Sequence, residues 1–192
     1  MSTEPADDLT TILRAARAGD ETAVAQLLPQ VYDELRKLAR ARMAQLPPGQ
    51  TLQPTALVHE AYVRMMGKNS EPLENRRHFF FVAARAMRDI LVEQARKKAG
   101  PKAGGRHRRV QFDEADPSYE TSSAEDMLAL NDALADLERE DPIKAQIVNL
   151  RYFTGMNMKE TADVLEMSER TLHRHWRFIR AWLKDRLSTE DE

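Results

Sequence analysis

The sequence predicts an all-α protein made of two small helical domains joined by a charged linker, the second domain ending in a helix-turn-helix. Apolar residues recur at three- and four-residue spacing along most of the 192-residue chain, and almost no segment alternates with the period of a strand. Proline and glycine divide these segments into separate helices. A polar stretch at 99–123 has little to bury, so it separates a domain at 1–98 from a domain at 124–192.

Four helices are expected in the first domain. The first covers residues 9–16, and the second continues to Leu46 with a kink or a restart at Pro29. A third helix covers residues 51–66. The fourth covers residues 77–98, where apolar positions and arginines lie on opposite sides.

The second domain begins with helices over residues 124–137 and after Asp141, an N-cap that precedes a proline. Asn157 is expected to cap a short helix that extends to Leu165, with an acid three positions later that completes a capping box. Ser168 then caps a second helix. The two together are typical of a helix-turn-helix, although Glu166 stands in the turn where glycine usually provides a positive φ, at a cost of about 1 kcal/mol.

The helix after Ser168 has one apolar stripe and one cationic face. A helix in the major groove needs side chains near its N-terminus that reach base edges, and guanidinium groups bond guanine bidentately. An ordinary amphipathic helix with a solvated basic face is the alternative. The candidates for DNA contact are Arg170, Thr171, His173, Arg174 and Arg177.

Charge is balanced overall but unevenly distributed. The chain has 29 lysines and arginines against 31 aspartates and glutamates, so the net charge gives no sign of a nucleic-acid partner. Residues 76–109 nevertheless form a basic block, opposed only by Asp89 and Glu93, and residues 113–141 form an acidic block in which Arg139 is the only cation. Local fields of this kind steer association with phosphates.

An enzyme, a metal site and a cofactor are not expected. There is no cysteine, which excludes a disulfide scaffold and a thiolate zinc site. The run His59-Glu60-Ala61-Tyr62 begins like a zinc-protease helix but continues with Val63 where the second histidine is needed. His173 and His175 are two positions apart on a helix and point in different directions.

A cytoplasmic protein without membrane insertion is expected. The first eight residues are acidic and lack a cationic lead into an apolar segment, and no apolar run is long enough to span a bilayer.

Several stretches together resemble one family. In the second domain they are Leu134–Leu137, Ile147–Met156 and the helix-turn-helix, and in the first domain they are Thr55–Met65 and Phe79–Lys98. With this order of helical domain, charged linker and helix-turn-helix, the chain resembles a bacterial RNA polymerase sigma factor of the extracytoplasmic-function (ECF) type.

The resemblance implies a transcription initiation factor that performs no catalysis and has core RNA polymerase and promoter DNA as partners. It implies that the helix-turn-helix reads the upstream (−35) element and that the first domain helps to open the downstream (−10) element. In the first domain, Arg85, Arg88 and Arg96 would contact phosphates, and the 68–75 loop would lie near an extruded base. An anti-sigma protein is a further candidate partner. The residues expected to contact polymerase are Leu57, Val58, Glu60, Tyr62 and Arg64.

Some of these roles have structural alternatives. The alternative for Leu57 and Ala61 is that both are core residues. At least two of the three phenylalanines at 79–81 are expected in the core, because three consecutive residues cannot share one helix face. The acidic segment of the linker either mimics nucleic acid inside the polymerase or is a solvated tether. Because of the domain order, we expect the two domains to close on each other in the absence of polymerase.

Two other functions compete with this interpretation. One is an operator-binding helix-turn-helix regulator that does not bind polymerase, and the other is a helical adaptor without DNA contact. An operator-binding regulator does not require the second basic helix, at residues 77–98. A helical adaptor leaves both this helix and the cationic helix after Ser168 unexplained.

Overall fold

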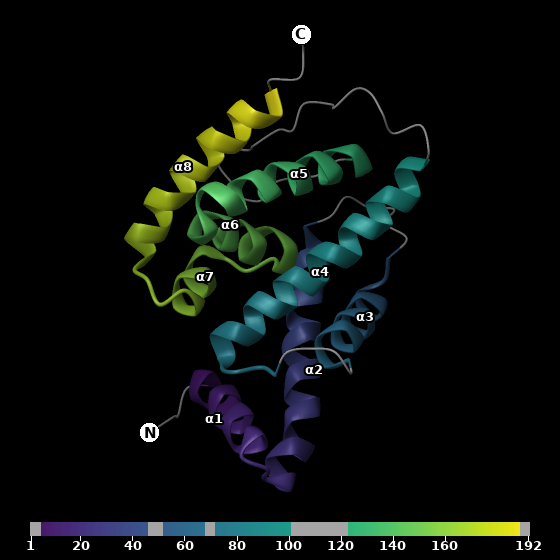
Figure 1. Cartoon of the computed structure of the whole chain (residues 1–192), viewed down its shortest axis with the longest axis vertical. Coiled ribbons are helices and arrows are strands. Elements are labelled where there is room, and N and C mark those ends of the chain that lie inside the picture. The colour runs from purple at the N-terminus through teal and green to yellow at the C-terminus, as the bar shows by residue number, and fades with distance from the viewer. Residues whose placement is uncertain (1–4, 46–51, 68–71, 101–122, 189–192) are drawn as a thin grey trace.

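The computed structural model describes residues 5–45, 52–67, 72–100 and 123–188, and every regular element in these ranges is helical (Figure 1). The all-α prediction is confirmed. The elements are α1 (Pro5–Arg17), α2 (Glu21–Ala44), α3 (Pro54–Met66), α4 (Arg76–Ala99), α5 (Ala124–Glu140), α6 (Pro142–Val148), the π-helical turn η2 (Asn149–Phe153), α7 (Met158–Val164) and α8 (Glu169–Ser188).

The second helix is continuous across Pro29 and ends at Ala44, two residues before the predicted end at Leu46. Asp20 caps it by accepting hydrogen bonds from the backbone N–H of Thr22 (2.8 Å) and Ala23 (3.1 Å). The helix then continues through Pro29, so a restart does not occur there. A proline inside a helix costs about 3 kcal/mol. Burial of α2 residues on both sides of it, including Ala23 and Val31, offsets that cost.

The helix at the centre of the molecule is α4. It contacts α1 and α3 of the N-terminal part and α5, η2 and α7 of the C-terminal part, and Figure 1 shows it crossing between the two groups. Phe79 and Phe80 are buried and Phe81 is half-buried, which confirms that at least two of these rings pack in the core. One contiguous apolar cluster reaches from Leu9 in α1 to Leu183 in α8.

The N-terminal and C-terminal groups of helices therefore pack directly against each other, as expected for the chain without polymerase. The assignment of separate domains to 1–98 and 124–192 stays a prediction. Most of the expected linker, 101–122, lies outside the described residues, and so does the start of the 68–75 loop.

A close backbone contact forms part of this packing. Gly155, which follows η2, has φ +73°, and a Cβ atom there would lie 2.6 Å from the backbone C of Ala41 and 2.6 Å from the backbone N of Arg42 in α2. The Nε2 of Gln45 donates a hydrogen bond to the Gly155 carbonyl at 3.4 Å. Beside it, the fully buried Arg42 guanidinium lies 4.2 Å from the centre of the Tyr152 ring.

Both hydrogen bonds of the predicted capping box of α7 are present. The Glu160 N–H donates to Asn157 Oδ1 at 2.9 Å, and the Asn157 N–H donates to Glu160 Oε2 at 2.8 Å. We expect Asn157→Ala to lower the free energy of unfolding by about 0.5–2 kcal/mol, measured by urea denaturation, because a backbone N–H loses its partner. Glu160→Gln retains an acceptor and should cost less. Equal losses in the two variants would contradict this explanation.

Candidate nucleic-acid interface

The C-terminal interface is built on α7, a tight turn and α8. Glu166 adopts the left-handed conformation predicted for the turn, with φ 54°. Behind the turn, the Met167 N–H donates to the Ala162 carbonyl at 3.0 Å, and Ala162 is buried as expected for the inner face of a short helix. The turn thus keeps the N-terminus of α8 at the surface.

The start of α8 is fixed by its predicted cap. The Thr171 N–H donates to Ser168 Oγ at 3.2 Å, and the two hydroxyl oxygens lie 2.9 Å apart. Thr171 is half-buried and its hydroxyl takes part in the cap. Of the five candidates, it is the one whose polar group already has a structural role.

The two faces of α8 are separated as predicted. Its apolar stripe packs toward α5, α6 and α7, with Leu172, Trp176, Ile179 and Leu183 buried. The other four candidates all lie on the exposed side: Arg170, His173, Arg174 and Arg177.

Contacts with α5 and η2 set the orientation of α8. Trp182 Nε1 donates to Glu140 Oε2 at 3.1 Å, and Arg186 forms an ion pair with Asp136. The Arg151 guanidinium lies 5.0 Å from the Trp176 ring centre and donates to the Met156 carbonyl at 2.9 Å. A helix held in this way presents its arginines in a defined direction, which base readout requires.

Two residues beside the cationic face were missed from sequence. The Phe178 ring is about half exposed, and Lys144 Nζ of α6 lies 4.4 Å from its centre. Helical spacing places Phe178 four positions after Arg174, which was a usable signal. The pairing with Lys144 depends on tertiary packing.

Positive charge also affects His175. Partial burial, together with the charges of Lys144 and Arg174, lowers the pKa of His175 below its usual value. The imidazole is consequently biased toward its neutral form at neutral pH, and the positive charge of this surface comes from arginine and lysine.

The acid stability of this domain should depend on Asp141, which caps α6. Its carboxylate pairs with Lys144 Nζ and accepts the Lys144 N–H at 3.0 Å, and these contacts lower the pKa of Asp141. A lowered folded-state pKa contributes stability above the unfolded-state value of about 3.9 that is lost as the pH falls below about 4. We expect Asp141→Asn, which keeps the cap acceptor, to flatten this loss in urea denaturation at pH 7 to 3. An unchanged pH profile would contradict the assignment.

The three candidate arginines of α4 do not share one environment. Arg85 and Arg96 are exposed, but Arg88 is buried between α4 and the C-terminal helices. In this conformation Arg88 is not accessible to DNA phosphates, which differs from the expectation for this residue. Its charge is instead satisfied by residues of the C-terminal helices, and no local pattern could have paired them with Arg88.

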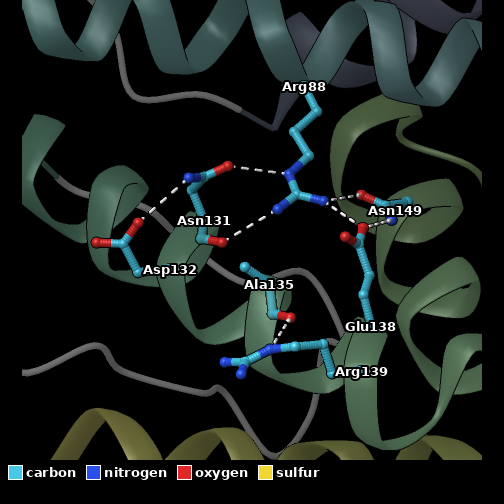
Figure 2. A network of polar contacts seen from close by, with 7 residues as sticks. All are labelled: Arg88, Asn131, Asp132, Ala135, Glu138, Arg139 and Asn149. Carbon is cyan, nitrogen blue, oxygen red and sulfur yellow. Dashed lines mark hydrogen bonds and ion pairs between the residues drawn. The ribbon is translucent and has the colours of Figure 1, made fainter.

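Figure 2 shows the polar network around Arg88. Nη1 donates to Glu138 Oε1 at 2.6 Å, Nε donates to Asn131 Oδ1 at 3.0 Å, and Nη2 donates to the Asn131 carbonyl at 3.0 Å. Asn149 Oδ1 lies 3.5 Å from Nη1, and its amide donates to Glu138 at 3.3 Å. All three guanidinium nitrogens therefore have partners from α5 or η2.

The residues assigned to polymerase contact divide into buried and surface positions. Leu57 and Val58 are buried in the core, so in this conformation their side chains pack inside the protein, and their contact with polymerase stays a prediction. Arg64 Nη2 of α3 lies 2.7 Å from Glu60 and 2.8 Å from Glu93 of α4. The half-buried Tyr62 ring packs edge-on against Tyr32, with centroids 6.4 Å apart.

Within the described ranges, no three histidine, aspartate or glutamate side chains are grouped so that they could hold a metal ion. None of the helices in these ranges is long and apolar enough to cross a membrane.

Comparison with known protein families gives one match over almost the whole chain. A family model described as ECF sigma factor matches residues 6–189. No curated protein and no solved structure matches the chain.

Proposed function

The chain belongs to the ECF sigma factor family, a family of non-enzymatic transcription initiation factors, and we propose that it binds core RNA polymerase and directs it to specific promoters in the cytoplasm. The observation that carries the proposal is the exposed cationic face of α8 on a helix whose other face is fixed to α5, α6 and α7. Such an arrangement suits a helix that enters the major groove of duplex DNA.

In this proposal α8 reads the −35 element. Arg170, Arg174 and Arg177 lie near the start of the helix and are exposed, so their guanidinium groups are available for bases or phosphates. Lys144 of α6 lies beside this face against Phe178, with its ammonium group paired with Asp141. Phosphate contacts would fix the register and base contacts would supply the sequence preference.

The proposal assigns the −10 element to α4. Arg85 and Arg96 are exposed there, and Arg88 joins them only after it leaves Glu138. A helix with several phosphate contacts can hold one strand of an opened duplex, which offsets part of the cost of unstacking a base.

Polymerase contact is assigned to the partly exposed side chains of α3. Glu60 and Arg64 lie on one side of the helix, toward Glu93 of α4, and Tyr62 lies on another side, against Tyr32 of α2. Leu57 and Val58 support the helix from inside. A mixture of an aromatic ring, an arginine and an acid is typical of the energetically important part of a protein interface.

The direct test is a pull-down with bacterial core RNA polymerase, followed by promoter-dependent transcription with and without the protein. Replacing Tyr62 and Arg64 by alanine together should weaken polymerase binding by at least about tenfold, because both are residue types that dominate interface energies. His59→Ala, an exposed change on the same helix, is the matched control, and circular dichroism checks that each variant is folded.

Sequence-specific DNA binding without affinity for polymerase would instead favour the operator-binding regulator. An anti-sigma partner stays a proposal, and co-purification from cells with the tagged chain tests it.

A further inference from the structure

The contact between α4 and the C-terminal helices buries Arg88, the middle one of the three α4 arginines that the proposed function gives to promoter DNA. We propose that this contact is autoinhibitory: Glu138, Asn131 and Asn149 hold Arg88 in the place of a DNA phosphate, and the closed protein must open before α4 can bind the promoter. This inference rests on the proposed function.

The geometry around Arg88 is that of an anion-binding guanidinium. Arginine recognises phosphate and carboxylate groups in the same way, through planar N–H donors that point to oxygen acceptors. Here the carboxylate of Glu138 takes one of these donors at 2.6 Å and the two oxygens of Asn131 take others. A phosphate cannot reach Arg88 while these acceptors remain.

A second arginine of α4 faces the same region. Arg85, Arg88 and Asp89 line an open cleft, and the opposite wall comes from Asn131, Glu138, Gln146 and Asn149. Arg85 is exposed within this cleft, so its charge also lies close to the C-terminal helices. Two of the three α4 arginines assigned to DNA therefore face protein in the closed form.

The closed form is held at further points away from Arg88. Arg77, near the start of α4, lies 3.9 Å from Glu166 in the turn before α8. At the other end of the interface, Gly155 meets the backbone of α2 and the Tyr152 ring lies against Arg42. Phe153 of η2 is also completely buried, and η2 packs against α4. The two groups of helices thus meet over a continuous surface.

The polar part of this contact is suited to reversible opening. The Arg88 side chain is 11% exposed, but that of Glu138 is 46% exposed, so water reaches one partner of the ion pair. A half-exposed pair is much weaker than a fully buried one, and it can be displaced by polymerase or by a phosphate that offers Arg88 an equivalent acceptor.

Opening can be measured on the free protein by thiol labelling. The chain has no cysteine, and Ala84 is 1% exposed on α4 beside Arg88, so Ala84→Cys introduces one thiol whose reaction with an aromatic disulfide reports the open population. Adding Glu138→Gln, which keeps the shape and removes the charge, should increase the labelling rate by about fivefold. Asp33→Asn removes one negative charge from α2, where the exposed carboxylate lies 3.6 Å from Arg36, and should leave the rate unchanged.

The functional consequence is measured on the full-length chain with core polymerase and promoter DNA. Apparent affinity is reduced by the fraction of protein that is closed, so Glu138→Gln should bind about fivefold more tightly than the wild type, and Asp33→Asn should not. A cleavable bis-maleimide tether between Arg77→Cys and Glu166→Cys should reduce transcription by at least about tenfold, with recovery after cleavage.

The outcomes separate this inference from the proposed function. Equal labelling and equal polymerase affinity in the wild type and Glu138→Gln, or full activity of the tethered protein, would overturn the inference and leave the sigma function intact. Faster labelling of Glu138→Gln without polymerase binding by any variant would overturn the proposed function, and the inhibitory role of the contact with it.

Discussion

Replacing Arg170, Arg174 and Arg177 together by alanine should reduce transcription from a promoter that depends on the −35 element by about 100-fold, because two or more base or phosphate contacts of the recognition helix are lost. The three side chains are exposed and have no part in the buried stripe of α8, so the fold should be unaffected. Single-round transcription and binding of the duplex −35 element measure the effect.

Salt dependence distinguishes the contacts within this triple variant. An arginine on a phosphate lowers the slope of log affinity against log salt by about one when it is removed, whereas an arginine on a base edge mainly relaxes sequence preference. The three single alanine variants should therefore differ in these two measurements. Replacing Arg14, Arg17 and Arg36 of α1 and α2, which are also exposed, removes the same charge and serves as the control. Equal losses in the two triple variants would mean that α8 acts only through net charge.

The second large effect is expected for Gly155→Ala, which should lower the free energy of unfolding by about 2–5 kcal/mol. A side chain at φ +73° costs about 1–2 kcal/mol, and overpacking adds about 1–3 kcal/mol. The clash is with backbone atoms of Ala41 and Arg42, 2.6 Å away, which cannot rotate aside as a side chain could. Urea denaturation of the full chain measures this change.

The matched control is Gly19→Ala. Gly19 also has a positive φ, 89°, but nothing lies within 4 Å of a Cβ atom there. Its substitution should show the conformational cost alone, about 1–2 kcal/mol. The difference between the two variants then measures the close approach of the C-terminal part to α2. Equal destabilisation would mean that the two groups of helices are not packed tightly at Gly155 in solution.

Gly155→Ala also tests the closed arrangement from a side remote from Arg88. If the alanine is accommodated by separation of the two groups of helices, the thiol at Ala84→Cys should become more reactive, as it should in Glu138→Gln. Both variants would then open one interface by different means, one by removing a charge and one by inserting a methyl group.

Local sequence signals were sufficient for the helices and for the surface of α8. The caps at Asp20, Asn157 and Ser168 act on backbone groups two or three positions away, and the apolar stripe of α8 repeats within a few turns. Because both signals act over one helix, they can be read without knowledge of the tertiary structure. The same helical geometry predicted core packing for at least two of the three phenylalanines at 79–81, and the structure shows that Phe79 and Phe80 are the two that are buried.

Sequence alone could not assign partners across the chain. Arg88 has the spacing of a surface cation, yet its partners Asn131, Glu138 and Asn149 are 43 to 61 positions away. The spacing of Leu57 and Val58 is compatible both with a helix that contacts a partner and with a helix that packs in the core. Only the packing of α3 on α2 and α4 shows that the two side chains are buried. Arg42 gave no sign that it would lie fully buried against Tyr152.

The sequence by itself determined which segments are helical, where most of them are capped and which face of α8 is cationic, because these properties depend on residues within a few positions of each other. Only the tertiary structure decided which charges remain available for DNA. An arginine is exposed or satisfied according to the acceptors that distant helices bring to it, and that arrangement is fixed by packing around α4.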